Sequence, residues 1–591
     1  MTNKYDRYRR ADDPLPRLTL AWNMYGAGLE NVGRDGAPEP FPIPEPGPGQ
    51  LLVRIDSVGM CFSDVKIIQQ GGSHPKLYNR DLQREPTRLG HEVALTVIKA
   101  GEELQDQYHP GQRLAVQPDL YQQGKSTAYG YTIPGGLIQY HLIGPEVLET
   151  DDGPGLLPLD GELGYAEASL LEPWGCVIAA YTQRRRLWPR EGGIMWIVGY
   201  PADDRDYTFS EGLDAPARIV LSDAPASVAR LAQQTGAEII VRDGLTPAEY
   251  EAVANELTGG TGFDDIVVLD PQDAKQVSAI ARHIARRGTM NLVGTRPLDD
   301  RVQADVGRLH YDYIAFIGNR GPDIAASYGE ARNRCELRPG GAAVFIGAGG
   351  PMGQMHVQRA IELPDGPQLL IATEVNDERL EALQEAFAPL AEEHGRDLYF
   401  FNPQNSEQSL HDFVMELTDG QGADDVVVSV PHALLMAEAA ELMNEKGMLV
   451  LFAGVPNGTL APLNLSNVYL GNAQFTGTSG LTIDDQREVL ERARARTLSP
   501  GRVVAAVGGM NAAREGMKAT MEGRYPGKIV IFPQIPDLPL MGLDELKQRE
   551  PEIGALLGPG DTWTQEAEAA LFQKYWSDHE SDTNSEGHET N

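Results

Sequence analysis

One stretch of this sequence occurs twice. Residues 261–271 (TGFDDIVVLDP) match residues 421–431 (QGADDVVVSVP) at a spacing of 160 residues. The match continues from 287–295 to 446–454 at a spacing of 159 residues. Each copy alternates apolar strand-like runs with helical stretches, the pattern of a parallel sheet with helices on its faces. Because an internal repeat constrains the architecture more than any local feature, the sequence predicts two tandem doubly wound α/β domains.

Only the second copy keeps a glycine turn suited to phosphate. A strand-like run leads into Gly347-Ala-Gly-Gly-Pro-Met-Gly353 and then into a helical stretch. Glycines at such a turn let backbone N–H groups approach a pyrophosphate at the helix N-terminus. Glu374 closes the next strand, where a carboxylate accepts ribose hydroxyls and repels a 2′-phosphate, so NAD is expected rather than NADP. A purely structural turn is the alternative. The predicted cofactor residues are Gly347, Gly349, Gly350, Pro351, Met352, Gly353, Glu374 and, near the adenosine, Arg379.

The corresponding turn of the first copy carries carboxylates instead. It reads VGYPADDRD over residues 198–206. Negative side chains where a pyrophosphate would lie repel it. We therefore expect the first copy to be degenerate and to bind no dinucleotide.

Three separate N-terminal segments carry side chains that bind metals. They contribute Cys61, the adjacent His91 and Glu92, and Glu172. Catalytic zinc takes three ligands from Cys, His and carboxylates and leaves one position open. In order and spacing these segments resemble the catalytic signature of the zinc-dependent medium-chain dehydrogenases, specifically their sorbitol-type polyol branch. The chain also looks like members of the sorbose-phosphate-reductase type.

The resemblance implies a fold and a metal site. The fold is an N-terminal GroES-like β-barrel catalytic domain, followed by two Rossmann-like domains and a C-terminal segment that returns to the barrel. Cys61, His91 and Glu172 are implied as the ligands of one catalytic zinc, with Glu92 alternating with water as a further ligand. Many relatives also bind a structural zinc through four cysteines, but residues 93–140 contain no cysteine. We therefore expect a single zinc per chain.

The resemblance also implies catalytic side chains. Ser63 matches the hydroxyl that accepts the substrate's alcohol proton, and Glu92 lies beside the ligand His91. Lys66 stands where many relatives carry a relay histidine, so it is a candidate for proton transfer or for binding a substrate anion, with a solvated lysine as the alternative. His74 and Trp174 are candidate pocket residues.

Several of these side chains have a structural interpretation as well. Cys61 could be a small buried residue, His91 a core histidine and Glu172 a helix cap. Tyr129-Gly-Tyr131 is a candidate for the substrate entrance.

Composition restricts the partners and the compartment. The net charge is −35, which disfavours nucleic acid, since binding phosphates requires a basic surface. The acidity fits either a salt-adapted protein or an ordinary acidic one. Three cysteines form no disulfide framework, which indicates a reducing cytoplasm. We expect no membrane segment, since no apolar run reaches about 18 residues, and no signal peptide, since the basic start leads into acidic residues.

The expected domains follow from these features. They are 1–185 (zinc catalytic domain), 186–338 (degenerate copy), 339–500 (NAD-binding copy), 501–535 (returning segment) and 536–591 (extension with a disordered acidic tail). Because edge strands of such domains pair in dimers, copy one could take the partner's place, giving a monomer that mimics a dimer; a homodimer is the alternative.

The expected function is hydride transfer between NAD and a secondary alcohol or ketone of a polyol or sugar. A ketose-phosphate reductase on the same scaffold is the nearest alternative. A zinc lyase or epimerase with transient use of NAD, and a non-catalytic scaffold derived from a dehydrogenase, are the others.

Overall fold

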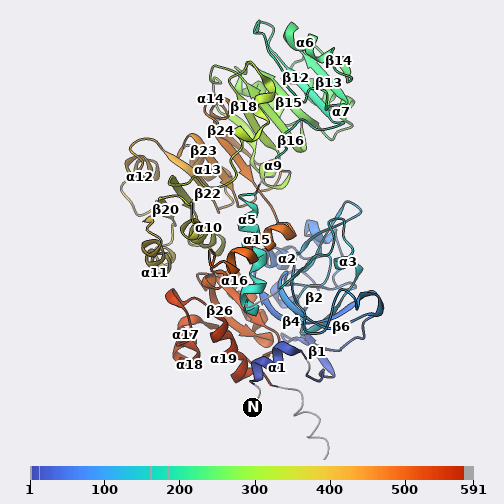
Figure 1. Ribbon diagram of the computed structural model, residues 1–591, viewed down its shortest axis with the longest axis vertical. Helices are drawn as coiled ribbons and strands as arrows, with labels where there is room; N and C mark the ends of the chain where they lie inside the picture. The colour runs from blue at the N-terminus through green and yellow to red at the C-terminus, as the bar shows by residue number, and fades with distance from the viewer. Residues whose placement is uncertain (1–2, 12, 160–162, 183–184, 578–591) are drawn as a thin grey trace, which may run out of the picture. The chain divides into compact units, whose positions relative to one another are not determined.

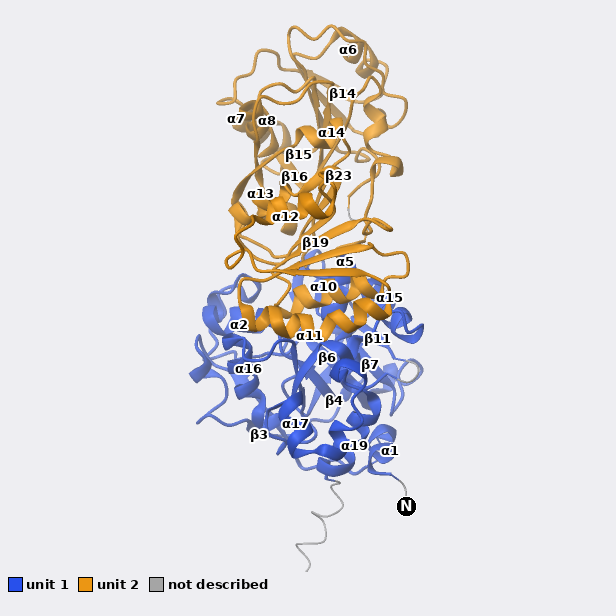
Figure 2. Cartoon of the chain, turned by 90° about the vertical axis from the view of Figure 1, so that its left-hand side faces the viewer, with its two compact units in different colours: residues 1–179, 480–591 blue, residues 180–479 orange. Residues whose placement is uncertain are grey.

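The computed structural model describes residues 3–11, 13–159, 163–182 and 185–577 (Figure 1). The chain forms two compact units, which Figure 2 shows in separate colours. Unit 1 contains residues 1–179 and 480–591, and unit 2 contains residues 180–479. The predicted domain boundaries at residues 185 and 500 therefore differ from the observed ones. The later boundary moves because helix α15 (Ile483–Arg494) packs against α5 (Leu171–Ala179) inside unit 1.

Unit 1 is built on one mixed sheet. Its strand order is β11-β7-β6-β4-β27-β26-β28, and β10 also pairs with β4. The strands come from both ends of the chain: β4 (Leu51–Gly59), β6 (Glu92–Ala100), β7 (Arg113–Val116), β10 (Tyr140–Ile143), β11 (Leu156–Pro158), β26 (Val504–Gly509), β27 (Lys528–Phe532) and β28 (Met541–Gly542). Three two-stranded pairs accompany it: β1 (Leu18–Ala21) with β3 (Glu39–Pro42), β2 (Asn23–Met24) with β5 (Thr87–Arg88), and β8 (Asp119–Gln122) with β9 (Lys125–Ala128).

The central strand β4 is buried on both faces, although it carries the polar residues Arg54, Asp56 and Ser57. All nine residues of β4 are buried, because helices and loops cover the sheet on either side. Antiparallel pairing places Gly59 of β4 opposite Glu92 of β6, and Val530 of β27 opposite Gly59. The start of β6, the end of β4 and the C-terminal strand β27 therefore meet at one point.

Helices of unit 1 lie at the ends of these strands. They are α1 (Lys4–Arg10), α2 (Phe62–Gln70), α3 (Pro145–Leu148), α4 (Tyr165–Ser169), α5, α15, α16 (Ala513–Glu522), α17 (Leu543–Arg549), α18 (Pro551–Gly554) and α19 (Gln565–Tyr575). Helices α1 and α19, from the two ends of the chain, lie side by side (Figure 1). The Tyr8 ring packs 4.5 Å from Phe572, centroid to centroid, in an aromatic cluster that also includes Tyr165. The C-terminal extension is thus part of the unit 1 core.

Unit 2 contains two six-stranded parallel sheets, and both follow the strand order 3-2-1-4-5-6 of dinucleotide-binding folds. The first sheet contains β14 (Glu238–Val241), β13 (Arg218–Ser222), β12 (Ile194–Val198), β15 (Phe263–Leu269), β16 (Ile284–Val293) and β18 (Ala315–Asn319). The second contains β21 (Asp397–Phe401), β20 (Leu369–Thr373), β19 (Ala342–Ile346), β22 (Ala423–Val428), β23 (Met443–Leu451) and β25 (Gln474–Gly477). A short antiparallel pair, β17 (Val302–Asp305) with β24 (Leu460–Leu463), joins the copies.

Helices accompany both sheets. Those of the first copy are α6 (Ala226–Ala232), α7 (Tyr250–Thr258), α8 (Ala274–Ala281) and α9 (Val306–Tyr311). Those of the second are α10 (Pro351–Glu362), α11 (Asp377–Glu393), α12 (Leu410–Leu417), α13 (Ala433–Ala440) and α14 (Ser466–Leu470). One apolar core contains buried side chains of both copies, so the two sheets form one unit rather than two separate domains.

Two sequence predictions concern the rest of the chain. The predicted disordered tail falls on residues 578–591, which lie outside the described residues. Among the residues that the structure does describe, no helix is both long and apolar enough to cross a membrane.

Candidate metal and nucleotide sites

The fold brings three metal-binding side chains together in unit 1. Cys61 follows β4 and occupies the N-cap position of α2, whereas His91 and Glu92 stand at the start of β6. Because β4 and β6 are neighbours, ligand atoms of these three residues lie within 4.8 Å of one another. His91 and Glu92 are buried and Cys61 is half-buried. A thiolate, an imidazole and a carboxylate at this separation are a ligand set for zinc.

Asp64 orients the histidine of this group. Its Oδ1 lies 3.3 Å from His91 Nδ1 and accepts the Gly90 N–H at 3.2 Å, while Oδ2 accepts the Cys61 N–H at 3.2 Å. A proton on Nδ1 shared with a carboxylate leaves Nε2 as the metal-binding atom. Burial disfavours the charged imidazole, but Tyr131, Asp64 and Cys61 outweigh it and raise the pKa of His91.

The two carboxylate oxygens of Glu92 differ in their contacts. Its Oε1 contacts the ammonium of Lys528, a buried residue of β27. Its Oε2 is buried and has no hydrogen-bond partner among the described residues. A Cβ on Gly59 would overlap Oε2, so glycine there makes room for the carboxylate. A buried carboxylate oxygen without a partner is costly, and a cation beside it relieves that cost. The residues present therefore fit a metal ion.

Glu172, a further predicted ligand, lies nearby but outside that group of three. It is buried in the first turn of α5, and its Oε1 lies 3.8 Å from the Cys176 thiol. Burial raises the pKa of Glu172 to about 7, with Glu92 also raising it and His91 lowering it. Whether Glu172 ligates the metal therefore stays a prediction.

The other predicted residues of unit 1 fall in two groups. Ser63 is half-buried and Lys66 exposed on α2, directly after Cys61, and His74 is half-buried, with its ring 5.8 Å from that of Tyr131. Trp174, in contrast, is fully buried, and its indole N–H donates to the Pro500 carbonyl oxygen at 3.4 Å; its place in the substrate pocket stays a prediction.

Two residues near the predicted metal ligands are not connected with those ligands by the sequence alone. Lys528 was recognised only as part of the returning segment, and its pairing with Glu92 depends on a strand register that local patterns do not reveal. Tyr131 is a candidate for the substrate entrance, and its ring lies 5.5 Å from that of His91, a contact that the sequence does not predict.

The glycine turn of the second copy has the backbone of a phosphate-binding turn. It lies between β19 and α10, and β19 is central in its sheet, between β20 and β22. Gly347 adopts a φ of +75°, which favours glycine. A Cβ on Gly353 would overlap the carbonyl oxygen of Gly347, whereas one on Gly350 would meet only open space, its nearest atom being 3.9 Å away. The turn therefore leaves room beside the N-terminus of α10, which fits a pyrophosphate.

Glu374 lies against this turn. A Cβ on Gly349 would come 2.5 Å from Glu374 Oε2, so the carboxylate reaches the turn. Its Oε1 accepts the N–H groups of Val375 and Asn376, at 2.8 and 3.1 Å. Arg379 is exposed in the first turn of α11. The Glu374 carboxylate thus lies beside the glycine turn, and its contact with a ribose stays a prediction.

The first copy lacks the corresponding helix. Residues 199–217, all of them described, connect β12 to β13 without a helix. Asp203 accepts hydrogen bonds from Arg205 and from the Tyr207 hydroxyl, at 3.2 and 2.6 Å. Without a helix N-terminus, the backbone donors that are predicted to hold a pyrophosphate in the second copy have no counterpart in residues 199–217.

Two family models and several known proteins match parts or most of this chain. An alcohol dehydrogenase GroES-like domain matches residues 47–149, and a zinc-binding dehydrogenase domain matches residues 351–495. L-sorbose 1-phosphate reductase of Klebsiella pneumoniae is 23% identical over 572 residues, which cover 94% of this chain and 98% of that protein. Mannitol-1-phosphate 5-dehydrogenase of Aliivibrio fischeri is 24% identical, with coverage of 90% and 94%. Sorbitol dehydrogenase of Gallus gallus is 27% identical, with coverage of 43% and 71%.

Among solved structures, a 2R,3R-butanediol dehydrogenase from Bacillus subtilis has the same fold, with a TM-score of 0.50 at 15% identity and coverage of 87% of this chain and 99% of that one. The predicted family resemblance is confirmed by the two domain matches and the relatives. This chain belongs to the zinc-dependent medium-chain dehydrogenase family and is an oxidoreductase.

Proposed function

We propose that this protein transfers hydride between NAD and a secondary alcohol or ketone of a polyol or sugar. The observation that carries the proposal is the group of Cys61, His91 and Glu92, in which a buried carboxylate oxygen has no hydrogen-bond partner within the described part of the chain. The relatives support the substrate class, since their names are those of polyol and sugar-phosphate enzymes.

One zinc ion per chain would be held by Cys61, His91 and Glu172, with Glu92 as an alternating ligand. Zinc supplies Lewis-acid polarisation of the substrate oxygen. Asp64 would keep His91 in the tautomer that presents Nε2, and Lys528 would stabilise the Glu92 carboxylate when Glu92 is not a ligand. The pairing with Lys528 supports an alternating role, because it stabilises the unligated carboxylate.

The side chains of α2 would handle the proton. Ser63 follows Cys61 by two residues and is half-buried, so its hydroxyl would be near the metal ligands while staying partly accessible to solvent. We assign it the acceptance of the alcohol proton during oxidation and its return during reduction.

The glycine turn would bind the cofactor. Gly347, Gly349, Gly350, Pro351, Met352 and Gly353 form the turn and the start of α10, which would hold the pyrophosphate. Glu374 would accept the adenosine ribose hydroxyls, which favours NAD over NADP, and Arg379 would lie near the adenosine. The nicotinamide supplies the hydride acceptor.

The test is NADH formation by the zinc-loaded protein with a panel of hexitols, sugars and their phosphates. We expect turnover of at least one member, loss of turnover in Cys61→Ala, and a preference for NAD over NADP that weakens in Glu374→Ser. Zinc-loaded protein that turns over no member of the panel would contradict the proposal.

A ketose-phosphate reductase is the second candidate. It is favoured by one observation: the two relatives that match over nearly the whole chain are both named for sugar phosphates, whereas the sorbitol dehydrogenase match covers 43% of the chain. The same panel separates the candidates by comparing each sugar with its phosphate.

We further propose that the first copy replaces a partner subunit. Its contacts with the second copy are reciprocal at a spacing of 159 residues: Val302 pairs with Leu463, and Ala304 pairs with Ala461. Equivalent residues thus exchange places, as in an interface with two-fold symmetry. Helix α14 packs on β18, and its counterpart α9 packs on β25.

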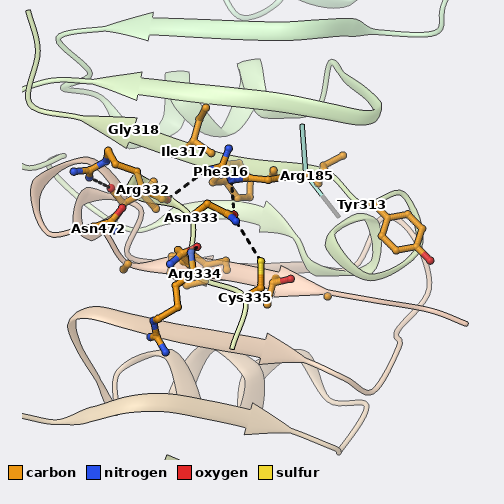
Figure 3. A pocket seen from close by; sticks show the side chains of 18 of the residues that line it. Arg185, Tyr313, Phe316, Ile317, Gly318, Arg332, Asn333, Arg334, Cys335 and Asn472 are labelled. Atoms are coloured by element: carbon orange, nitrogen blue, oxygen red, sulfur yellow. Dashed lines mark hydrogen bonds between the residues drawn. The ribbon is translucent and has the colours of Figure 1, made fainter. Parts of the chain in front are cut away.

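The edge strands β18 and β25 face each other at the centre of this arrangement. They line a cavity of about 60 Å³ together with Arg185, Arg332 and Cys335 (Figure 3). Matching ion pairs anchor the segment ahead of each copy: Arg186 to Asp265, and Arg334 to Asp425. A monomer is therefore expected in solution; a mass showing a stable dimer formed through the second copy would contradict this.

A further inference from the structure

Basic side chains lie beside the metal ligands in unit 1. Lys66 stands three residues after Ser63 on α2, and side chains at this spacing share one face of a helix. The spacing corresponds to about one helical turn, or about 5 Å along the axis. Lys66 is exposed, so its ammonium is accessible to a ligand whose reacting hydroxyl lies at Ser63.

Tyr131 connects a second basic group to the metal ligands. Its ring centroid lies 5.5 Å from that of His91 and 5.8 Å from that of His74. His74 is therefore one aromatic ring away from a metal ligand. Among the charged groups that act on His74, Lys76 and Lys66 are the two that lower its pKa, after burial. The three basic residues thus form one cluster, which we call the α2 basic cluster (Lys66, His74 and Lys76).

Hydrogen bonding fixes the donor of His74. Its Nδ1 accepts the backbone N–H of Lys76 at 3.3 Å. In a neutral imidazole whose Nδ1 accepts, the proton is on Nε2. The lowered pKa of His74 keeps it neutral near pH 7. His74 therefore presents an N–H donor rather than a second charge.

Only one cation of the α2 basic cluster is available to a ligand. Lys76 lies 2.5 Å from Asp119 and 5.0 Å from the Tyr131 ring centroid, so its charge is neutralised within the unit. Within the described ranges, no carboxylate forms an ion pair with Lys66. On a chain with a net charge of −35, an exposed lysine without an acidic partner beside the metal ligands is a site of local positive potential.

We propose that Lys66 and the Nε2–H of His74 bind the phosphate of a sugar-phosphate substrate whose hydroxyl or carbonyl lies at the metal. The inference rests on the proposed function and assigns its substrate class. An ammonium and an N–H donor suit a phosphate, which accepts several charge-assisted hydrogen bonds. Lys76, fixed by Asp119, positions His74 through its backbone N–H.

The test compares each hexitol or ketose with its phosphate in the zinc-loaded protein. We expect kcat/KM to be higher for the phosphate. In Lys66→Gln this preference, the ratio of the two kcat/KM values, should fall about 10- to 100-fold, the range for one hydrogen bond to a charged group. Lys125→Gln is the matched control: Lys125 lies in the β8–β9 hairpin of the same unit and should leave the ratio unchanged.

A binding measurement without turnover completes the test. Titration calorimetry of zinc-loaded protein with inorganic phosphate should show binding that weakens in Lys66→Gln and in His74→Gln but not in Lys125→Gln. Equal use of sugar and phosphate, or a phosphate preference that survives Lys66→Gln, would overturn the inference while leaving the proposed function intact. Absence of turnover on every substrate would contradict the proposed function instead, and the calorimetry would still decide the fate of the phosphate site.

Discussion

The ammonium of Lys528 contacts the carboxylate of Glu92 inside unit 1, and the other Glu92 oxygen has no partner among the described residues. Lys528 comes from the C-terminal strand β27, and Glu92 directly follows the predicted ligand His91. Burial disfavours the charged ammonium, but Glu92 and Cys61 outweigh it and raise the pKa of Lys528. The returning segment therefore supplies part of the electrostatic balance of the metal site.

Removal of this ammonium should cost stability in a zinc-dependent way. Lys528→Met leaves the Glu92 carboxylate buried and unpaired, so the free energy of unfolding of the metal-free protein should fall by about 3–5 kcal/mol. Zinc should restore part of the loss, because it gives Glu92 another cation. The check is urea unfolding with and without zinc. Lys547→Met, whose lysine lies at the surface of the same unit, should cost less than about 1 kcal/mol; equal losses in the two variants would contradict the prediction.

Glycine at position 59 should be needed for zinc binding. In Gly59→Ala the new Cβ overlaps Glu92 Oε2, so the carboxylate must move away from Cys61 and His91. We expect at least a tenfold loss of zinc affinity, as for displaced groups around a metal, measured by competition with a chelator. Gly236→Ala meets open space and serves as the control. An unchanged affinity in Gly59→Ala would show that Glu92 has no part in the metal site.

Glycine at position 350 should matter to the cofactor but not to the fold. A Cβ there meets no atom nearer than 3.9 Å in the protein, but it would project into the space assigned to the pyrophosphate. Gly350→Ala should therefore keep the thermal stability of the protein without cofactor and weaken NADH binding about tenfold or more. Fluorescence titration with NADH measures the second effect. Wild-type NADH affinity in this variant would place the cofactor elsewhere.

Acidification should destabilise the second copy through His356. His356 is fully buried. This burial, with a smaller contribution from Arg359, lowers its pKa to about 3. In the native state His356 stays neutral, whereas in the unfolded chain it binds a proton below about pH 6.5. Its contribution to the free energy of unfolding is therefore fully present above that pH and is lost as the pH falls. Between pH 6.5 and pH 5 the wild type should lose about 2 kcal/mol more than His356→Gln. The measurement is urea unfolding of both proteins across this pH range. The same pH dependence of the free energy of unfolding in the two proteins would refute the prediction.

Glu568 should stabilise the packing of the C-terminal helix α19 within unit 1. Its buried carboxylate accepts hydrogen bonds from the Tyr165 N–H, the Ala166 N–H and the Tyr5 hydroxyl, at 2.7, 2.9 and 2.9 Å. Glu568→Ala leaves these donors without an acceptor and should cost about 3 kcal/mol or more in urea unfolding. Glu566→Ala, an exposed position on the same helix, should cost little. A similar cost at both positions would mean that α19 contributes only helix propensity.

The sequence predicted those parts of the fold that depend on local patterns. Cys61, His91 and Glu92 could be singled out because their residue types are rare and chemically specific, and the structure brings them together. The glycine turn was predictable because Gly347 and Gly353 occupy positions where a side chain does not fit. No helix follows β12 directly, and the only feature of the sequence that pointed to this was the carboxylates of that turn.

Long-range pairings were not predictable in the same way. The contact of Lys528 with Glu92 joins residues far apart in sequence through the register of β27 on β4. The division of the chain into compact units at residue 480, rather than 500, does not follow from the sequence, because α15 continues the helical pattern of the second copy but packs on α5 of unit 1. Neither Lys528 nor α15 carries a local signal of its partner, since packing partners depend on the tertiary fold.

The central claim is that one zinc ion, bound by Cys61 and His91 with a carboxylate, makes this protein an NAD-linked oxidoreductase. The most direct test titrates zinc into metal-free protein and follows NADH formation on the best substrate of the panel. We predict that activity rises to a plateau at one zinc per chain and stays absent in Cys61→Ala at every zinc concentration. Activity without zinc, or full activity in Cys61→Ala, would contradict the account.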